Sequence, residues 1–205
     1  MAEPGRDILL RCQCGRLRGL ARDVTPQLGF RFICYCGDCQ AFARFLDRPD
    51  VLDAAGGTDI FHLPAGRVTL TAGTNSVRCL QFSNRVYRWY TECCRTPIAN
   101  SAGPRFPVVG LIHSCMDHGA EGRDEVLGAP LCRIFERSAV APLPANAPPP
   151  PSLKLFALRG SKLLGWWLRG LGRPNPFFDD RTKAPFSSPR VFTADERAAL
   201  KNRNS

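Results

Sequence analysis

The sequence predicts a mainly β protein with a cysteine-rich zinc site and a C-terminal helical tail. Four runs of strand length lie between Asp59 and Tyr90, separated by turn-forming segments. Ten cysteines occur in the chain, and several lie within a few residues of one another. A proline-rich segment then precedes a stretch with helical periodicity. We therefore expect an antiparallel β domain over residues 1–140, a linker over 141–151 and a basic helical tail over 152–205.

Composition supports a folded protein in a reducing compartment. The 205 residues are 44% hydrophobic and 22% charged, which is typical of globular chains. The first residues are polar, and the apolar run Ile8–Leu10 is too short for the core of a secretory signal. We expect a cytoplasmic location, where closely spaced cysteines indicate metal binding more often than disulfides.

The first elements are predicted from short apolar patterns. Residues 8–20 alternate around a turn at Gly15, which predicts two short strands. Residues 30–33 predict a strand that leads into the richest cysteine cluster. Apolar side chains within residues 40–46 then predict a short helix, which the Arg48–Pro49 pair ends.

The central part of the chain is predicted to be β throughout. Turn-forming residues separate consecutive runs, as expected for an antiparallel sandwich or a barrel-like sheet. A further apolar run covers residues 107–112. The four main runs are residues 59–63, 67–71, 77–82 and 86–90.

The tail combines a predicted helix with a high positive charge. Residues 150–205 carry +7 of the formal net charge of +10. Ser152 can cap a helix that reaches to about Leu171. Charged residues within this helix argue against a membrane-spanning segment. The stripe at 153, 156, 160, 163, 167 and 171 either docks on the preceding domain or a second subunit, or contacts a membrane surface through residues 152–178. The last residues, 195–201, predict a short helix after a Thr193 cap.

A nucleic-acid partner is not expected, because no aromatic and basic motif of a known RNA or DNA module occurs. The sequence does not indicate an oligomeric state.

The cluster Cys34, Cys36 and Cys39 is the strongest functional signal. Thiolates spaced in this way on a glycine-containing turn can converge on one ion, and sulfur ligands favour zinc. Three cysteines supply only part of the tetrahedral coordination of zinc. The fourth ligand either comes from elsewhere in the fold, or the fourth coordination position stays open to water or substrate. Buried free thiols and disulfides are the alternatives.

Three motifs in order resemble the glutathione-dependent formaldehyde-activating (GFA) family, which includes centromere protein V. They are Cys12–Gly15, Cys34–Cys39 and Cys94–Pro97, and the resemblance covers roughly residues 8–115. It implies a tent-like β fold that holds two zinc ions. It further implies a structural site that includes Cys12, Cys14 and Cys94, and a second zinc on Cys34, Cys36 and Cys39 whose open position receives substrate.

The third motif departs from the family pattern. The family has Cys-x-x-Cys-Gly-Thr-Pro, whereas this chain has Thr91 at the first cysteine position. Cys93 is the candidate replacement, although vicinal cysteines reach one tetrahedral ion only if the backbone bends. We therefore expect one or two zinc ions, depending on whether this site retains its metal.

Two functions remain open from the sequence. An open zinc site could act as a carbon–sulfur lyase on a thiol–aldehyde adduct of glutathione type, with Asp38 or a histidine moving the proton. Alternatively, the protein is a non-catalytic zinc scaffold that binds a protein or a membrane surface through its basic tail.

Several smaller features have two interpretations each. His113, Cys115 and His118 have ligand-like spacing, but a strand-end position with ordinary hydrogen bonds is the simpler interpretation. His62, like Cys79 and Cys132, fits a buried structural position. Three arginines lie on or near the predicted strands: Arg78, Arg85 and Arg88. They either contact an acidic substrate or line a solvated face of the sheet.

Overall fold

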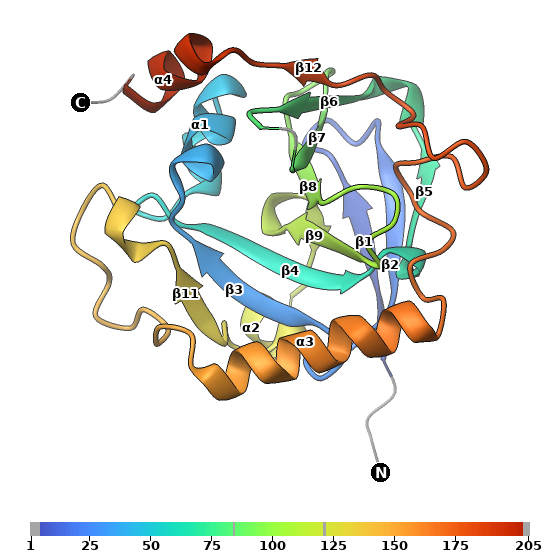
Figure 1. Ribbon diagram of the computed structural model, residues 1–205, viewed down its shortest axis with the longest axis horizontal. Helices are drawn as coiled ribbons and strands as arrows, with labels where there is room; N and C mark the ends of the chain where they lie inside the picture. Colours follow the sequence, from blue (N-terminus) through green and yellow to red (C-terminus); the bar gives the residue numbers. More distant parts are fainter. Residues whose placement is uncertain (1–4, 84, 121, 203–205) are drawn as a thin grey trace.

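Two β-sheets form the body of the protein in the computed structural model, which describes residues 5–83, 85–120 and 122–202 (Figure 1). The smaller sheet has four strands in the order β10-β1-β2-β5. Its neighbouring strands are all antiparallel. They span Met116–Asp117, Arg6–Arg11, Arg18–Val24 and Val68–Ala72.

The larger sheet has eight strands in the order β11-β3-β4-β9-β8-β7-β6-β12. Its inner pairs are antiparallel, whereas β11 pairs parallel with β3 and β12 pairs parallel with β6. The mainly β prediction is therefore confirmed, with parallel pairs at both edges of this sheet. The strands span Cys132–Ile134, Phe30–Cys34, Thr58–Pro64, Val108–Ile112, Pro97–Ser101, Tyr87–Thr91, Val77–Gln81 and Arg190–Val191.

Strand prediction succeeded where the sequence alternates and failed where strands are very short. The four central runs correspond to β4, β5, β6 and β7, and the run at 107–112 corresponds to β9. The apolar strand pattern around Cys132 corresponds to β11, whereas β8, β10 and β12 were not predicted. Strands β10 and β12 have two residues each, too few for a period-two pattern. Helix α2, Arg123–Leu127, was also missed.

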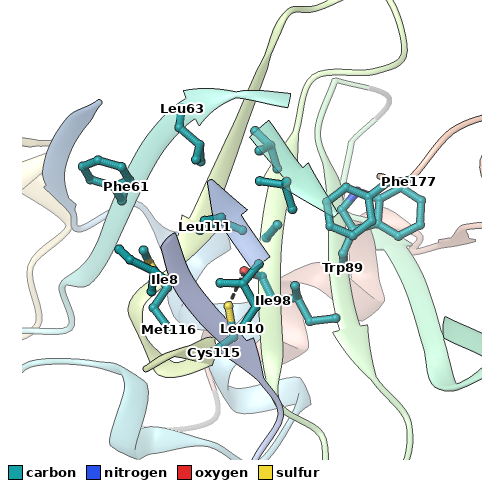
Figure 2. Packing of buried hydrophobic residues seen from close by; sticks show 14 of the residues in the cluster. Ile8, Leu10, Phe61, Leu63, Trp89, Ile98, Leu111, Cys115, Met116 and Phe177 are labelled. Atoms are coloured by element: carbon teal, nitrogen blue, oxygen red, sulfur yellow. Dashed lines mark hydrogen bonds between the residues drawn. The ribbon is translucent and has the colours of Figure 1, made fainter. Parts of the chain in front are cut away.

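The main core fills the space between the two sheets (Figure 2). Side chains of β1, such as Ile8 and Leu10, face Leu63 of β4 and Leu111 of β9 across this core. Strand alternation accounts for this arrangement, because Ile8 and Leu10 are buried whereas their neighbours along β1 are exposed.

The segment after the proline linker shares this core. Phe177 and Phe178 are both about 1% exposed and belong to the main cluster. Phe177 stacks on Trp89 of β7 with ring centroids 4.6 Å apart. The predicted division at residues 141–151 therefore describes the order of segments along the chain and does not separate two cores.

Helix α3, Leu153–Leu168, begins at the predicted cap, where Ser152 Oγ accepts a hydrogen bond from the Leu155 N–H. It ends before Leu171, and Gly170 follows it with a positive φ of 66°. Helix α4, Ala194–Asn202, also begins at its predicted cap, because the Glu196 N–H donates to Thr193 Oγ1. Among the described residues, no helix has both the length and the apolar character that crossing a membrane requires.

Helix α3 docks on the domain through a different face from the predicted stripe. Trp166 is buried, and Leu155 packs against the cluster of β3 side chains. The Lys162 ammonium donates to the Gly29 carbonyl at 3.0 Å. The predicted docking stripe is largely exposed instead, with Leu153 at 87% and Trp167 at 62%.

We predict that the segment after the linker contributes to global stability. Phe177→Ala should lower the free energy of unfolding by about 3–5 kcal/mol, because it removes a fully buried ring stacked on Trp89. Phe186→Ala is the matched control, because that ring is 68% exposed and should change stability by less than about 1 kcal/mol. Denaturant unfolding measures both. Equal losses would contradict a shared core.

Candidate metal centre

Four cysteines from two distant turns bring their sulfur atoms together. Cys12 and Cys14 follow β1, and Cys93 and Cys94 lie between β7 and β8. The Sγ–Sγ distances are 3.5 Å for Cys12–Cys14, 3.4 Å for Cys14–Cys93 and 3.8 Å for Cys93–Cys94. All four sulfur atoms lie within 4.8 Å of one another, and all four cysteines are free. We name this group the four-cysteine cluster.

Two backbone turns make this convergence possible. Gly15 has a φ of 73°, a conformation that glycine adopts without strain, and its N–H donates to the Cys12 carbonyl. Arg95 directly follows the vicinal pair and has a left-handed φ of 53°. The backbone bend that a vicinal pair requires is therefore present, and Cys93 supplies the fourth sulfur.

Thr91 occupies the position of the expected cysteine but has a different role. Its hydroxyl accepts a hydrogen bond from the Thr96 N–H, which leaves its own hydrogen for Cys94 Sγ at 3.4 Å. The Thr96 hydroxyl lies 3.2 Å from the same sulfur and accepts from the Gln13 N–H. Burial raises the pKa of Cys94, but the hydrogen bonds from these two hydroxyls, together with those from the Cys14 backbone and the Cys12 side chain, lower it to about 5. Thr91 thus stabilises a thiolate.

The second group, which we name the three-cysteine cluster, forms where β3 leads into helix α1, Gly37–Phe45. Cys34 ends β3, and its Sγ lies 3.7 Å from that of Cys39 in the first turn of the helix. Cys36 is the N-cap of α1, and its Sγ accepts a hydrogen bond from the Cys39 N–H. A helix N-terminus favours negative charge on such a cap.

The three sulfur atoms differ in their protonation. Hydrogen bonds from Cys34 and Cys39 are the main causes that lower the pKa of Cys36, and the charge of Arg88 adds to them. The hydrogen bond toward Cys36 raises the pKa of Cys34 far above the ordinary thiol range. Cys36 is therefore the first thiolate of this cluster.

Arg88 places a buried positive charge beside the three-cysteine cluster. This β7 residue is 4% exposed, and its Nη1 lies 3.5 Å from Cys39 Sγ and 3.3 Å from Asn100 Oδ1. Burial alone would lower the pKa of Arg88, but the charges at Cys39 and Cys36 raise it. Arg78 lies on the same face of the sheet as Arg88 by strand register, but it pairs with Glu92 at the surface and does not contact the cluster.

Both clusters fit a tetrahedral zinc ion. Zinc–sulfur bonds of about 2.3 Å place sulfur ligands about 3.8 Å apart. Four Sγ–Sγ distances in the four-cysteine cluster and the Cys34–Cys39 distance in the other are 3.4 to 3.9 Å, and all sulfur atoms of each group lie within 4.8 Å of one another. Among the described residues, no histidine or carboxylate joins either group. One cluster thus offers a complete set of four sulfur ligands, and the other offers three.

Asp38 is already engaged in ion pairs. Arg197 of α4 donates to both of its carboxylate oxygens at 2.8 Å, and Lys201 lies 3.1 Å away. The Asp38 carboxylate therefore joins the beginning of α1 to α4 through two cationic side chains. The sequence did not reveal these ion pairs, because Arg197 and Lys201 lie about 160 residues from Asp38 along the chain.

The histidines lie apart from the sulfur groups. His62 packs edge-on against Phe32, and burial lowers its pKa to about 3. His113 contacts the Asp59 carbonyl through Nδ1, and neither His113 nor His118 belongs to a metal-ligand group of the described residues. Cys115 donates to the Ile98 carbonyl in the main core (Figure 2). The ligand-like spacing of residues 113–118 therefore does not bring its side chains to one site.

The remaining thiols are structural. Cys79 and Cys132 are buried as predicted, and burial raises the pKa of each.

Residues 5–185 match a protein family described as a family of unknown function (DUF6151). The chain belongs to this family. The matched region includes the four-cysteine cluster, the three-cysteine cluster, the proline linker and all of helix α3. DUF6151 therefore covers much more of the chain than residues 8–115, to which the GFA resemblance is confined. No curated protein matches the sequence.

We predict that Thr91 supports metal binding without being a ligand. Thr91→Val should lower zinc affinity about tenfold, because it removes a hydroxyl that contacts Cys94 Sγ. Thr91→Ser should preserve the affinity, and Thr71→Val, at an exposed position of β5, is the matched control. Competition with a chromophoric chelator measures the affinity. If Thr91→Val and Thr91→Ser bind zinc equally well, the hydroxyl has no such role.

Proposed function

We propose that this DUF6151 protein binds two zinc ions with different roles. The observation that carries the proposal is the arrangement of seven sulfur atoms in one group of four and one group of three, with the atoms of each group within 4.8 Å of one another. The four-cysteine cluster provides a closed shell, which is characteristic of structural zinc. The three-cysteine cluster leaves one position for an external ligand, as catalytic zinc sites do.

The external ligand of the second ion is proposed to be a small thiol. A zinc ion at such a site supplies a Lewis acid that favours the thiolate form of a bound thiol. The resemblance to GFA proteins extends this to a carbon–sulfur lyase that acts on a thiol–aldehyde adduct of glutathione type. Three thiolates and one divalent cation carry a net charge of −1, which the guanidinium of Arg88 balances.

The protein side chains around this site restrict the possible proton carriers. Arg88 is fixed by Asn100 and by the rings of Phe42 and Phe82, each 5.7 Å from the guanidinium carbon. Its role is to hold charge and orientation. Asp38 is paired with Arg197 and Lys201, so a role in moving the proton would require its carboxylate to leave these ion pairs.

A second candidate function is a non-catalytic zinc scaffold. The observation that favours it is the position of α4, whose ion pairs with Asp38 fix it beside the beginning of α1. Gly37 lies close to Lys201, because a Cβ there would be 3.2 Å from the lysine side chain. In this alternative, the C-terminal segment restricts access to the three-cysteine cluster.

Metal content tests the two-site proposal. Protein purified without added zinc should contain two ions, and Cys36→Ser and Cys94→Ser should each contain one, because each removes a ligand from a different cluster. Cys79→Ser is the control, since Cys79 lies in neither cluster and should leave the content at two. Elemental analysis measures the ratio. A content that Cys94→Ser leaves unchanged would show that the four-cysteine cluster holds no metal.

Cobalt substitution tests the open position. In cobalt-loaded protein, a small thiol should change the visible absorption of the three-cysteine site, because it becomes a fourth sulfur ligand. The change should persist in Cys94→Ser and disappear in Cys36→Ser. Turnover of a glutathione–formaldehyde adduct then distinguishes a lyase from a scaffold. If no thiol alters the spectrum, the scaffold alternative is favoured.

A further inference from the structure

Helix α3 presents an apolar stripe to solvent. The residues of this stripe fall within about a third of the helix circumference, since each residue advances by about 100°. They lie opposite the face that packs on the domain, and Figure 1 shows α3 along the periphery of the molecule. The stripe comprises Leu153, Phe156, Leu164, Trp167 and Leu168, which are 87%, 54%, 56%, 62% and 69% exposed.

The orientation of α3 is fixed by contacts on its inner face. Lys162 donates to the carbonyls of Gln27 and Gly29, and the Arg159 guanidinium lies over the Phe30 ring at 5.7 Å. Trp166 is 6% exposed on this same face. Two of the three basic side chains of the helix thus point inward while large apolar side chains point outward, which is the reverse of an ordinary surface helix.

A basic pocket adjoins the C-terminal end of the stripe. It has a volume of about 470 Å³, and its lining includes Trp167, Phe106, Arg105, Arg173 and Lys183. None of its lining residues is acidic. Within the described part of the chain, neither Arg105 nor Arg173 forms an ion pair with a carboxylate. The pocket can therefore accept an anionic group beside an apolar surface.

The chain segment that carries the stripe is basic. Residues 152–178 contain five basic residues and no Asp or Glu, although Asp179 and Asp180 follow directly and the Lys183 ammonium donates to the Asp180 carbonyl. Lys154 and Arg169 are both exposed near the two ends of α3, where their flexible stems can reach outward. Two copies packed through this face would bring like charges together, which opposes self-association. An anionic surface has the complementary charge.

We propose that α3 and the pocket of Arg105, Arg173 and Lys183 form a docking surface for a membrane that contains anionic phospholipids. The apolar stripe enters the boundary between headgroups and acyl chains, and Trp167 lies at that boundary as tryptophan does in other interfacial helices. The basic side chains contact the phosphate and carboxylate groups of the lipids.

Vesicle flotation of the full chain tests the proposal. The protein should float with vesicles of phosphatidylcholine mixed with phosphatidylserine, remain soluble with phosphatidylcholine alone, and dissociate at high salt. Trp89 and Trp166 are already buried, so a blue shift of tryptophan emission on vesicle binding would report Trp167. Absence of flotation with anionic vesicles would overturn the proposal.

Two double variants separate the stripe from the pocket. Phe156→Ser with Trp167→Ser, and Arg105→Glu with Arg173→Glu, should each weaken vesicle partitioning about tenfold or more. Leu9→Ser and Arg22→Glu are matched controls at exposed positions of the smaller sheet and should bind normally. Near-ultraviolet circular dichroism confirms that each variant is folded.

Sedimentation velocity provides the opposing outcome. A wild-type dimer that becomes monomeric in the Phe156→Ser and Trp167→Ser variant, without vesicle binding, would assign the stripe to an interface between copies and overturn the membrane proposal. A wild-type monomer that floats with anionic vesicles, with both double variants impaired, supports it.

Discussion

Crowding of sulfur atoms is the constraint on which the candidate site depends. Each thiol that ionises makes ionisation of its neighbours more costly, so neither cluster can carry its full charge without a cation. The surroundings of the cysteines favour the thiolate form at some positions and oppose it at others. Hydroxyl groups lower the pKa of Cys94, and the helix N-terminus receives Cys36, whereas burial raises the pKa of Cys12. A shared cation would relieve the repulsion within each group.

Local patterns predicted much of the fold and the identity of the sulfur groups. Strands β4 to β7 alternate along the chain, and the CxCxxC spacing is a property of one short segment. The contribution of Cys93 was harder to predict, because it depends on the left-handed turn at Arg95. The role of Thr91 was not predictable at all, since its hydrogen bonds to Thr96 and Cys94 form only once β7 and β8 are paired.

The orientation of α3 shows a different limit of sequence patterns. Periodicity located the apolar stripe, but it could not decide which side of the helix faces the domain. Lys162 lies on the face of α3 that packs on the domain, where its ammonium donates hydrogen bonds to the carbonyls of Gln27 and Gly29. A long polar side chain can therefore satisfy its hydrogen bonds inside, and the apolar residues remain outside. The family match to residue 185 includes this helix.

Helix α1 connects the two sulfur groups physically. Cys36 caps its first turn, and Arg48, three residues beyond its end, donates to Thr96 Oγ1, the hydroxyl that supports Cys94. The helix has nine residues, so it spans about 14 Å. Metal ions bound at the two clusters would both restrict this helix, and any coupling between them would be equal in both directions, because thermodynamic coupling is reciprocal.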